Sequence, residues 1–275
     1  MIFKNFIKKS WWLPIILINM LSCSENNEPN QHNNTNVTYK VEKEATEVHI
    51  GVPSKNLPPY FIYWNRKGME HDILHEAFQN SNYKPIFSYI QNREEIFLKN
   101  KSNLDCISTV TEKLGYDGFY SHNVITYQDV AIYLKDSGLN INSKIDLADK
   151  KIEAFNDANK YLDIKDIVAN NPFYYEHSGK ASQILLLYRG KVDVLLMDKY
   201  LFFYFRNKVK KLIDMDRKVE VRPIFSKHPY QILCKDKKIR DDFNYGLSVL
   251  YTGERHQQIV KKYTNNEYLH NEKFD

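Results

Sequence analysis

Hydrophobic residues near the start of the folded part alternate between two periods. β-type runs at 48–52, 85–90 and 104–108 predict three strands, and apolar residues recur at helical spacing over 69–78. Asn92, with two glutamates in the turn that follows it, predicts the start of another helix. This strand–helix alternation predicts a mostly parallel sheet with helices on both faces.

A second alternating series begins near Val130. Its apolar run 192–197 is nearly continuous, which is typical of a strand covered on both faces. Two such series predict an α/β fold of two lobes with a ligand cleft beyond the carboxyl ends of the strands. We expect one lobe to comprise 45–127 and 227–275, and the other 128–226. The other elements predicted in this series are strands at 130–134, 152–155, 173–177 and 230–235, and helices at 157–169, 181–188, 236–251 and 254–263, with Gly190 just past one helix end.

Composition excludes several classes of protein. The chain has 275 residues, of which 43% are hydrophobic and 35 are Tyr or Phe (20 and 15), too many for a disordered chain. Nine Gly exclude a collagen-like chain, and three Cys are too few for a disulfide scaffold. Cys106 and Cys234 lie in apolar, strand-like contexts, which favours two buried free thiols. An oxidising compartment would permit a disulfide instead.

The first 23 residues have the order of an export signal. Three lysines precede the apolar run 11–21, which is too short to span a bilayer and is followed by Ser22 and Cys23. We therefore expect a signal peptide over 1–23. Its end resembles the lipobox of bacterial lipoproteins, with Met20 where leucine is usual, so we expect a lipid on Cys23, with ordinary secretion as the alternative. In lipoproteins generally, Ser24 beside the cysteine favours the outer membrane.

Residues 24–44 are polar and rich in asparagine, which predicts a disordered tether. Loss of the signal's lysines Lys4, Lys8 and Lys9 lowers the formal net charge from +5 to +2, so no nucleic-acid partner is expected. The sequence contains no G-x-G-x-x-G and no G-K-[ST] motif, and we expect no cofactor.

Six stretches follow one another along the chain in the order known from one family. They are Leu57-Pro58-Pro59-Tyr60; Gly68-Met69-Glu70 with Asp72-Ile73-Leu74; Asn103-Leu104-Asp105 with Thr109-Val110-Thr111-Glu112-Lys113; Ile145-Asp146-Leu147 with Lys150-Lys151-Ile152; 188–193, ending at Asp198; and 235–263, with Asn244, Leu247, Gly253, Ile259 and Tyr263 in register. Together they resemble the bacterial extracellular solute-binding proteins of family 3, the periplasmic binding proteins of polar amino-acid uptake systems. The resemblance covers about residues 47–264.

This resemblance implies two hinged lobes of the type II, or Venus flytrap, form that close over a small polar solute and present it to the membrane subunits of an ABC permease. It implies a periplasmic monomer, held at a membrane by its lipid, that binds without covalent chemistry and has no catalytic residue. Closure would be a population shift, because the solute contacts both lobes only in the closed state.

Two departures from the family pattern and one retained residue bear on the solute. The family binds an α-carboxylate with the arginine that ends its T-E-K-R motif, whereas this position is Leu114 or, with a one-residue gap, Lys113. The family's Gly-Thr, with backbone donors at a helix start, aligns with Asp157-Ala158, where a carboxylate would repel another. Asp198 remains where the family binds the α-amino group. These departures favour a cation or an amine over a zwitterionic amino acid, and a neutral polar solute is the alternative.

The candidate ligand-binding residues each have a structural alternative. The rings of Tyr60 and Trp64, after the first strand, would stack on a solute or cap the core. Thr109 and Thr111 follow a strand end and would offer donors to a solute or make ordinary turn contacts. The full set of candidates is Tyr60, Trp64, Thr109, Thr111, Lys113, Asp157 and Asp198.

For the charged residues the alternatives are equally specific. Asp198 would bind a cation or cap the following helix, and Lys113 is a solvated lysine unless the gapped alignment holds. Glu70 and Asp72 are expected as charges in the first turn of their helix.

Two rival functions remain at this stage. His71 and His75 stand at i and i+4, the spacing of the zincin H-E-x-x-H motif. Because Asp72 is one methylene shorter than the usual glutamate and no third ligand can be placed, a zinc hydrolase is the weaker rival and no metal is expected. The other rival is a ligand-sensing or interaction protein of the same fold that does not transport.

Overall fold

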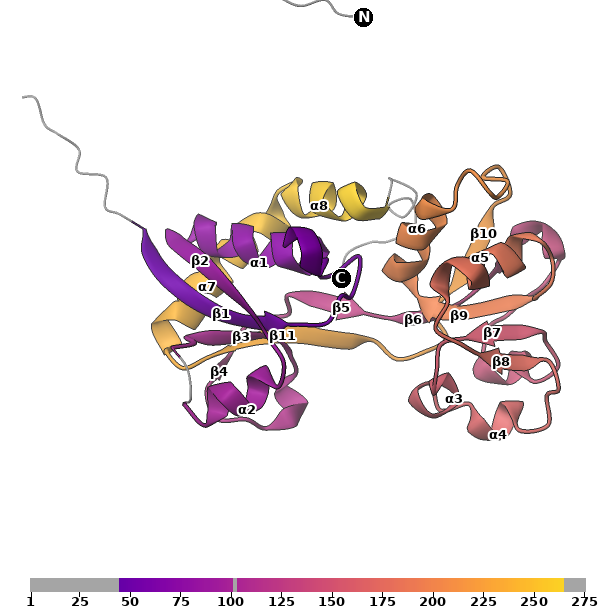
Figure 1. The fold of residues 1–275 in the computed structure, drawn as a ribbon, viewed down its shortest axis with the longest axis horizontal. Coiled ribbons are helices and arrows are strands. Elements are labelled where there is room, and N and C mark those ends of the chain that lie inside the picture. The colour runs from indigo at the N-terminus through magenta and orange to yellow at the C-terminus, as the bar shows by residue number, and fades with distance from the viewer. Residues whose placement is uncertain (1–44, 101–102, 265–275) are drawn as a thin grey trace, which may run out of the picture. The chain divides into compact units, whose positions relative to one another are not determined.

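The computed structural model describes residues 45–100 and 103–264, which form two β-sheets with helices on both faces of each (Figure 1). The first sheet has the strand order β2-β1-β3-β11-β4, with β5 pairing β11, and the second has the order β10-β6-β9-β7-β8. We call the elements around these sheets the first and second lobes. The predicted signal 1–23 and tether 24–44 lie outside the described residues.

The first lobe is built from strands near both ends of the described chain. Its strands are β1 (Thr46–Pro53), β2 (Tyr83–Ile90), β3 (Cys106–Val110), β4 (Phe119–Tyr120), β5 (Ile125–Tyr127) and β11 (His228–Cys234), and its helices are α1 (Met69–Asn80), α2 (Arg93–Leu98), α7 (Lys237–Thr252) and α8 (Arg255–Thr264). Short 3₁₀ turns follow β1 (η1, Tyr63–Asn65) and β3 (η2, Glu112–Leu114).

Helix α1 packs closely against α7 on one face of the first sheet, and α2 covers the opposite face (Figure 1). The predicted helical spacing over 69–78 is confirmed, since the apolar residues of α1 are fully buried. Gly246 of α7 allows the close approach of the two helices, because a Cβ there would lie 1.9 Å from the carbonyl oxygen of Ala77.

The second lobe has a layer of helices on each face of its sheet. Leu195 and Met197 of β9 pack in the same core as α5 and α6, whereas Val194 and Leu196 pack with α3 and α4. This confirms the predicted strand that is covered on both faces.

The strands of the second lobe are β6 (Asp129–Leu134), β7 (Ile152–Ala154), β8 (Tyr174–Glu176), β9 (Val194–Asp198) and β10 (Val219–Arg222). Its helices are α3 (Ala158–Tyr161), α4 (Lys165–Val168), α5 (Lys180–Tyr188) and α6 (Lys199–Lys208), and the 3₁₀ turns η3 (Lys135–Ser137) and η4 (Lys144–Leu147) lie between β6 and β7.

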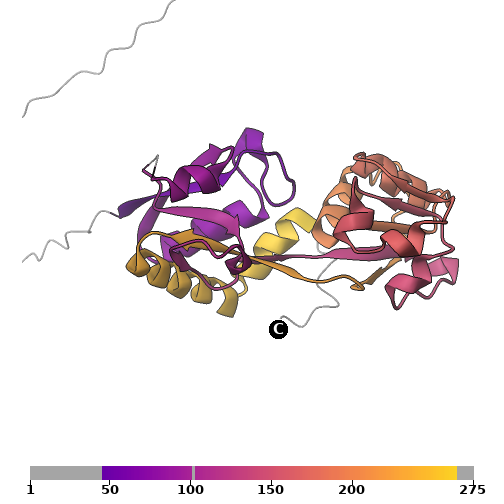
Figure 2. The same ribbon diagram turned by 90° about the horizontal axis from the view of Figure 1, so that it is seen from below.

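The chain links the two lobes twice. It leaves the first sheet through β5, passes Gln128 and enters the second sheet as β6, and it returns from β10 to β11, with β5 and β11 paired as antiparallel strands (Figure 2). The prediction of mostly parallel sheets is wrong, because both sheets are mixed. Linking strands run from one sheet directly into the other without a crossover helix, so β6, β10 and β11 lie antiparallel to their neighbours.

The predicted single helix over 157–169 is also wrong. The segment forms two short helices, α3 and α4, separated by Asp163, whose φ of 52° is left-handed. Aspartate is one of the few residues that adopt this conformation readily, and it ends a helix there.

Cys106 and Cys234 form a disulfide, so the expectation of two free thiols is wrong. The two residues are 128 positions apart in sequence, but β3 and β11 are neighbours in the sheet and the two cysteines face each other directly across that pair. Both side chains are fully buried.

No helix within residues 45–100 and 103–264 has both the length and the apolar character needed to cross a bilayer.

Candidate ligand site

Tyr60 brings the two lobes into contact. It lies in the turn after β1, is 1% exposed, and its hydroxyl donates to Oδ1 of Asp198 at the end of β9 over 2.7 Å. Its ring stacks on that of Tyr127 at 3.7 Å between centroids and meets the edge of Tyr200 at 6.2 Å. Burial and the neighbouring carboxylate raise the pKa of Tyr60, so its hydroxyl stays a donor.

Asp198 has two roles at once. As expected from its alternative assignment, it caps α6, with Oδ1 accepting from the backbone N–H of Leu201 at 2.9 Å. Its other oxygen accepts from the N–H of Gln128, the residue between β5 and β6, at 3.1 Å. Burial raises the pKa of this carboxyl, and these backbone bonds together with the Tyr60 bond oppose the rise. Asp198 thus joins the first lobe, the link between the lobes and the second lobe.

Glu70 is a fully buried carboxyl that sequence reasoning did not place in the site. As expected, it lies in the first turn of α1 with Asp72. Its carboxylate also accepts from the hydroxyls of Thr109 and Tyr127, each at 2.7 Å. Burial raises the pKa of Glu70 to about 7, although these two bonds and the charge of Arg93 favour the ionised form.

Thr109 stands at a strained position at the end of β3. Its φ of 56° is left-handed, an arrangement that costs a β-branched residue about 1–3 kcal/mol. Arg93 supports it: Nε donates to the carbonyl of Ser108 at 3.1 Å and Nη2 to that of Thr109 at 3.2 Å. The same Nη2 lies 3.0 Å from the carboxylate of Glu94.

A second carboxylate lies beside Asp198. Asp129 begins β6 and pairs directly with Asp198 across the antiparallel β6–β9 pair. Burial, followed by the charge of Asp198, raises the pKa of Asp129 to about 7, and Lys180 opposes that rise. We call Tyr60, Glu70, Thr109, Tyr127, Asp129 and Asp198 the junction cluster.

Asp157 and Glu176 lie at the same end of the second sheet as Asp198. Glu176 ends β8 and accepts from the backbone N–H of Asp157 at 2.7 Å and of Asn159 at 2.8 Å, at the start of α3. The hydroxyl of Tyr174 donates to the same carboxylate. The exposed side chain of Asp157 pairs with Lys160 at 3.2 Å.

The remaining candidates stand apart from the junction cluster. Trp64 lies on η1 and is 75% exposed. Thr111 directly precedes η2, and its carbonyl accepts from the N–H of Leu114. Lys113 is exposed on that turn. Among the described residues, no hydrogen bond or ring contact joins these three side chains to the cluster. The predicted lipidation site Cys23 lies outside the described residues.

His71 and His75 share one face of α1, as their spacing predicts. Their rings are 6.3 Å apart between centroids, and the ring of His71 lies 4.6 Å from that of Phe87 on β2. Nδ1 of His71 lies 3.4 Å from Oδ1 of Asp72. Across residues 45–100 and 103–264, no group of three or more His, Cys, Asp or Glu side chains is placed to hold a metal ion.

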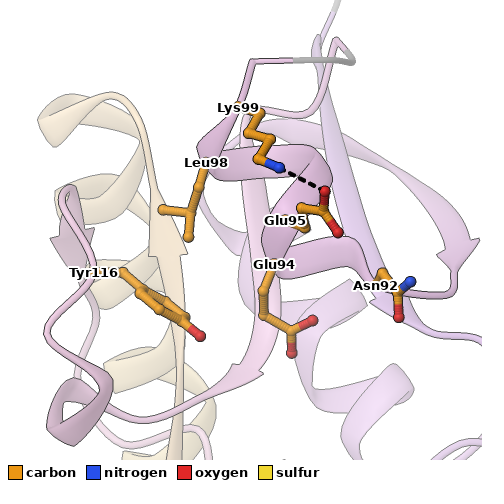
Figure 3. Close-up of a pocket in the computed structure, with 6 residues that line it drawn as sticks. All are labelled: Asn92, Glu94, Glu95, Leu98, Lys99 and Tyr116. Atoms are coloured by element: carbon orange, nitrogen blue, oxygen red, sulfur yellow. Dashed lines mark hydrogen bonds and ion pairs between the residues drawn. The ribbon is translucent and has the colours of Figure 1, made fainter.

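A surface pocket of about 420 Å³ lies beside α2 (Figure 3). Two of the residues that line it form an ion pair, in which Nζ of Lys99 donates to Oε1 of Glu95 at 2.7 Å. None of the candidate residues lines this pocket, so it is separate from the junction cluster. Its lining residues are Asn92, Glu94, Glu95, Leu98, Lys99 and Tyr116.

Neither a protein-family model nor a curated protein matches the sequence. Solved structures match the fold. The chain is similar to a polar amino acid ABC uptake transporter substrate binding protein from Streptococcus thermophilus, with 23% identity and a TM-score of 0.64 over 80% of this chain and 86% of that one. The chain has the two-lobed periplasmic-binding-protein fold.

Two further structures share this fold. An ancestral cationic amino acid solute binding protein is 16% identical, with a TM-score of 0.61 over 79% of this chain and 95% of that one. The GluR0 ligand binding core, solved in complex with L-glutamate, is 16% identical, with a TM-score of 0.54 over 81% of this chain and all of that one. The expected fold is therefore confirmed, and the junction cluster lies where the chain of a periplasmic-binding-protein fold passes from one lobe to the other.

Proposed function

We propose that the protein is an extracytoplasmic solute-binding protein of the family 3 type, which captures a small polar solute between its lobes. The solute is an amino acid, an amine or a related compound. The observation that carries this proposal is the hydrogen bond between Tyr60 of the first lobe and Asp198 of the second, in a fold shared with solute-binding proteins. Polar and aromatic groups that meet across two hinged lobes are suited to surrounding a small molecule.

In this proposal the solute acts by stabilising a closed arrangement of the lobes. A solute that contacts Tyr60 and Asp198 together gains both sets of contacts only when the lobes are closed, so its binding shifts the population toward closure. The bond from Tyr60 to Asp198 is exchanged for contacts with the solute. Binding needs no covalent step, and we assign no catalytic residue.

The cellular setting belongs to the same proposal. We propose export by a signal over 1–23, a lipid on Cys23 that holds a monomer at a membrane of the periplasm, the outer membrane being favoured by Ser24, and delivery of the solute to an ABC permease. The first lobe would comprise 45–127 and 227–275, and the second 128–226.

A ligand-sensing role is the second candidate. The similarity to the GluR0 ligand binding core, solved in complex with L-glutamate, supports it, because there the same fold is a ligand binding core. Uptake of a labelled solute by cells with and without this protein separates the two roles: a transport protein is required for uptake, and a sensor is not.

A thermal-shift screen over amines, amino acids, organic acids and short peptides tests the proposed function. A solute at 100 times its dissociation constant adds about 2.7 kcal/mol to the free energy of unfolding. Small-angle scattering with and without the hit then reports closure. If no compound stabilises the protein and scattering never changes, the proposal is wrong.

Asp198→Asn makes the screen specific to the site. Asparagine is also a good helix N-cap, so α6 keeps its cap while the charge is lost. We expect a cationic hit to bind about tenfold or more weakly, because a charge-assisted hydrogen bond is replaced by a neutral one. Asp216→Asn, at an exposed aspartate of the same lobe, is the control and should leave the affinity unchanged.

A further inference from the structure

The second lobe carries exposed cations at its end remote from the junction cluster. Helices α5 and α6 pack against each other on one face of the second sheet, and α6 begins directly after Asp198 (Figure 1). The 208–218 segment ends α6 and leads into β10, whose first residue pairs with Leu134 of β6. Leu134 follows Asp129 of the junction cluster by five residues, which is about 17 Å along the strand.

Two segments that are separate in sequence bring these cations together. Nη1 of Arg217 donates to the carbonyl of Tyr188 at 2.9 Å, and Nη2 of Arg206 donates to the carbonyl of Met215 at 3.1 Å. These bonds hold the end of α5 and the turn that follows it beside the 208–218 segment. The exposed cations of the two segments, which we call the basic surface, are Arg189, Lys191, Lys208, Lys210, Lys211 and Lys218.

The acids at this end of the lobe do not neutralise the basic surface. Asp136 accepts from Arg217 at 2.8 and 2.7 Å, and Arg217 is not one of the six cations. Asp214 and Asp216 are exposed on the 208–218 segment, where Oδ1 of Asp214 accepts from the N–H of Asp216 at 2.9 Å. Among the described residues, no acid forms an ion pair with a cation of the basic surface. Six cations against two acids leave an excess of four positive charges.

The ends of the two helices account for only part of this charge. Arg189 is the C-cap of α5 and Lys208 ends α6, where the partial negative charge of the last carbonyl groups favours a cation. The other four residues of the basic surface lie beyond the helices, and this effect falls off within the last turn. Like charges gathered on a surface repel one another, so the stability of the fold does not explain these four lysines. An anionic partner does.

Leu212 and the choice of lysine indicate which anionic partner fits. Leu212 directly follows Lys210 and Lys211 and is 65% exposed. Lysines beside an exposed apolar side chain can contact headgroups and the boundary of the acyl chains together. Five of the six cations are lysines, which act as point charges without the fork geometry of arginine. Such charges suit a fluid surface of many phosphates better than one fixed phosphate or carboxylate.

We propose that the basic surface and Leu212 form a docking surface for a bilayer that contains anionic phospholipids. The lysines attract the headgroups, and the leucine side chain enters the boundary between headgroups and acyl chains. Docking through this end of the second lobe keeps the bilayer away from the junction cluster by about the length of β6. The inference does not depend on which solute the protein binds.

Binding of the full chain to lipid vesicles tests the inference. The probes are vesicles of phosphatidylcholine alone and vesicles that also contain about 30% phosphatidylglycerol, and the readout is the ratio of the two partition coefficients. The unmodified protein should prefer the anionic vesicles about tenfold or more at low salt, and most of this preference should disappear at about 0.5 M salt. Equal binding to both kinds of vesicle overturns the inference.

A triple variant tests the lysines themselves. Lys210→Gln combined with Lys211→Gln and Lys218→Gln should lower the ratio about tenfold or more, because each lysine near an anionic surface strengthens binding about fivefold. Every variant has the same N-terminal residues, so any affinity of those residues for membranes cancels when the ratios are compared. An unchanged ratio in this variant contradicts the inference.

A matched triple variant separates this surface from overall charge. Lys55→Gln, Lys165→Gln and Lys261→Gln remove the same charge from exposed lysines in other parts of the fold. This control should keep the ratio of the unmodified protein. If both triple variants lower the ratio equally, net charge explains the preference and the docking surface is wrong.

Leu212→Ser tests the apolar contact. The variant should bind anionic vesicles about fivefold more weakly, because part of the leucine side chain is no longer transferred from water to lipid. Ile145→Ser is the control, since Ile145 is also 65% exposed but lies on η4, outside the basic surface. Equal affinities of the two serine variants would contradict a bilayer that contacts Leu212.

Two soluble polyanions separate a bilayer from other partners. A DNA duplex and polyglutamate are titrated into the unmodified protein and the first triple variant. Binding of either polymer through the three lysines, without a preference for anionic vesicles, would overturn the inference in favour of a nucleic acid or an acidic protein. Failure of the vesicle experiment leaves the proposed solute binding standing, and failure of the solute screen leaves this inference standing.

Discussion

Glu70 of the first lobe and Glu176 of the second are both held near the junction, but by different kinds of donor. Glu70 accepts from the side-chain hydroxyls of Thr109 and Tyr127, whereas Glu176 accepts from two backbone N–H groups as well as Tyr174. A hydroxyl can donate or accept, and a backbone N–H can only donate. The hydroxyl partners of Glu70 can therefore stay bonded to it in either protonation state, whereas each backbone N–H partner of Glu176 requires an acceptor oxygen.

The lobes also differ in covalent cross-linking between the strands of their sheets. The disulfide between Cys106 and Cys234 joins two strands of the first sheet, and the described strands of the second sheet contain no cysteine. The chain between the two cysteines includes all of the second lobe's strands. The disulfide therefore links the part of the first lobe that precedes the second lobe in sequence to the part that follows it.

Removing the disulfide is the largest expected change. The double variant Cys106→Ala and Cys234→Ala should lower the free energy of unfolding by about 2–5 kcal/mol, measured by denaturant titration. Hydrogen exchange should quicken in β3 and β11 and stay unchanged in β7 and β9. When a reductant is present throughout refolding, the denaturation midpoint of the unmodified protein should fall to that of the variant. The midpoint of the variant should not change. Faster exchange spread equally over both sheets would contradict the contrast between the lobes.

The next effect is the pH dependence of Glu70. Its folded-state pKa of about 7 lies above the ordinary value of 4.5, so its contribution to stability is complete below about pH 4.5 and is lost as pH rises through 7. Relative to Glu70→Gln, the unmodified protein should lose about 3 kcal/mol of unfolding free energy between pH 4.5 and 8.

The same measurement on Asp129→Asn compares a carboxyl of the second lobe with Glu70 of the first. The pKa of Asp129 is also raised to about 7, from an ordinary value of 3.8, so the sign is the same and the change between pH 4.5 and 8 should be about as large as for Glu70. A smaller change for Asp129→Asn would show that the partial exposure of its side chain weakens the effect of burial. Denaturation midpoints at about six pH values are sufficient, because the pH dependence of the groups that all variants share cancels when the variants are compared.

Local sequence pattern predicted most of the fold. The buried run in β9, the apolar face of α1 and much of the order of strands and helices follow from periodicity. The strands β4, β5 and β10 were not predicted, and 157–169 was predicted as one helix instead of two. Long-range pairing could not be predicted in this way. The mixed sheets and the Cys106–Cys234 disulfide depend on β11 returning beside β3 after 128 residues, and no local pattern marks that neighbour.

Only part of the candidate site could be predicted from the sequence, and the binding role of its residues stays a prediction. Tyr60 and Asp198 were named from the sequence, and they meet in the structure. Glu70 and Glu176 were missed as partners, because a glutamate in a first helical turn or at a strand end is common and shows nothing of what lies across the fold from it. A glutamate at the end of a strand that precedes an apolar helix was the only available signal for Glu176.

The smallest predicted effects come from the two tyrosines that bind these carboxyls. At pH 8, Tyr127→Phe should cost about 2 kcal/mol, because ionised Glu70 is fully buried and keeps only Thr109. Tyr60→Phe should cost about 1 kcal/mol, because partly buried Asp198 retains the N–H groups of Leu201 and Gln128. At pH 5 Glu70 is protonated and needs fewer donors, so the cost of Tyr127→Phe should fall toward that of Tyr60→Phe. Thermal and denaturant unfolding of both variants at the two pH values measure the gap. A gap that stays constant with pH would contradict this account, because it would mean that protonation of Glu70 does not change its dependence on the Tyr127 hydroxyl.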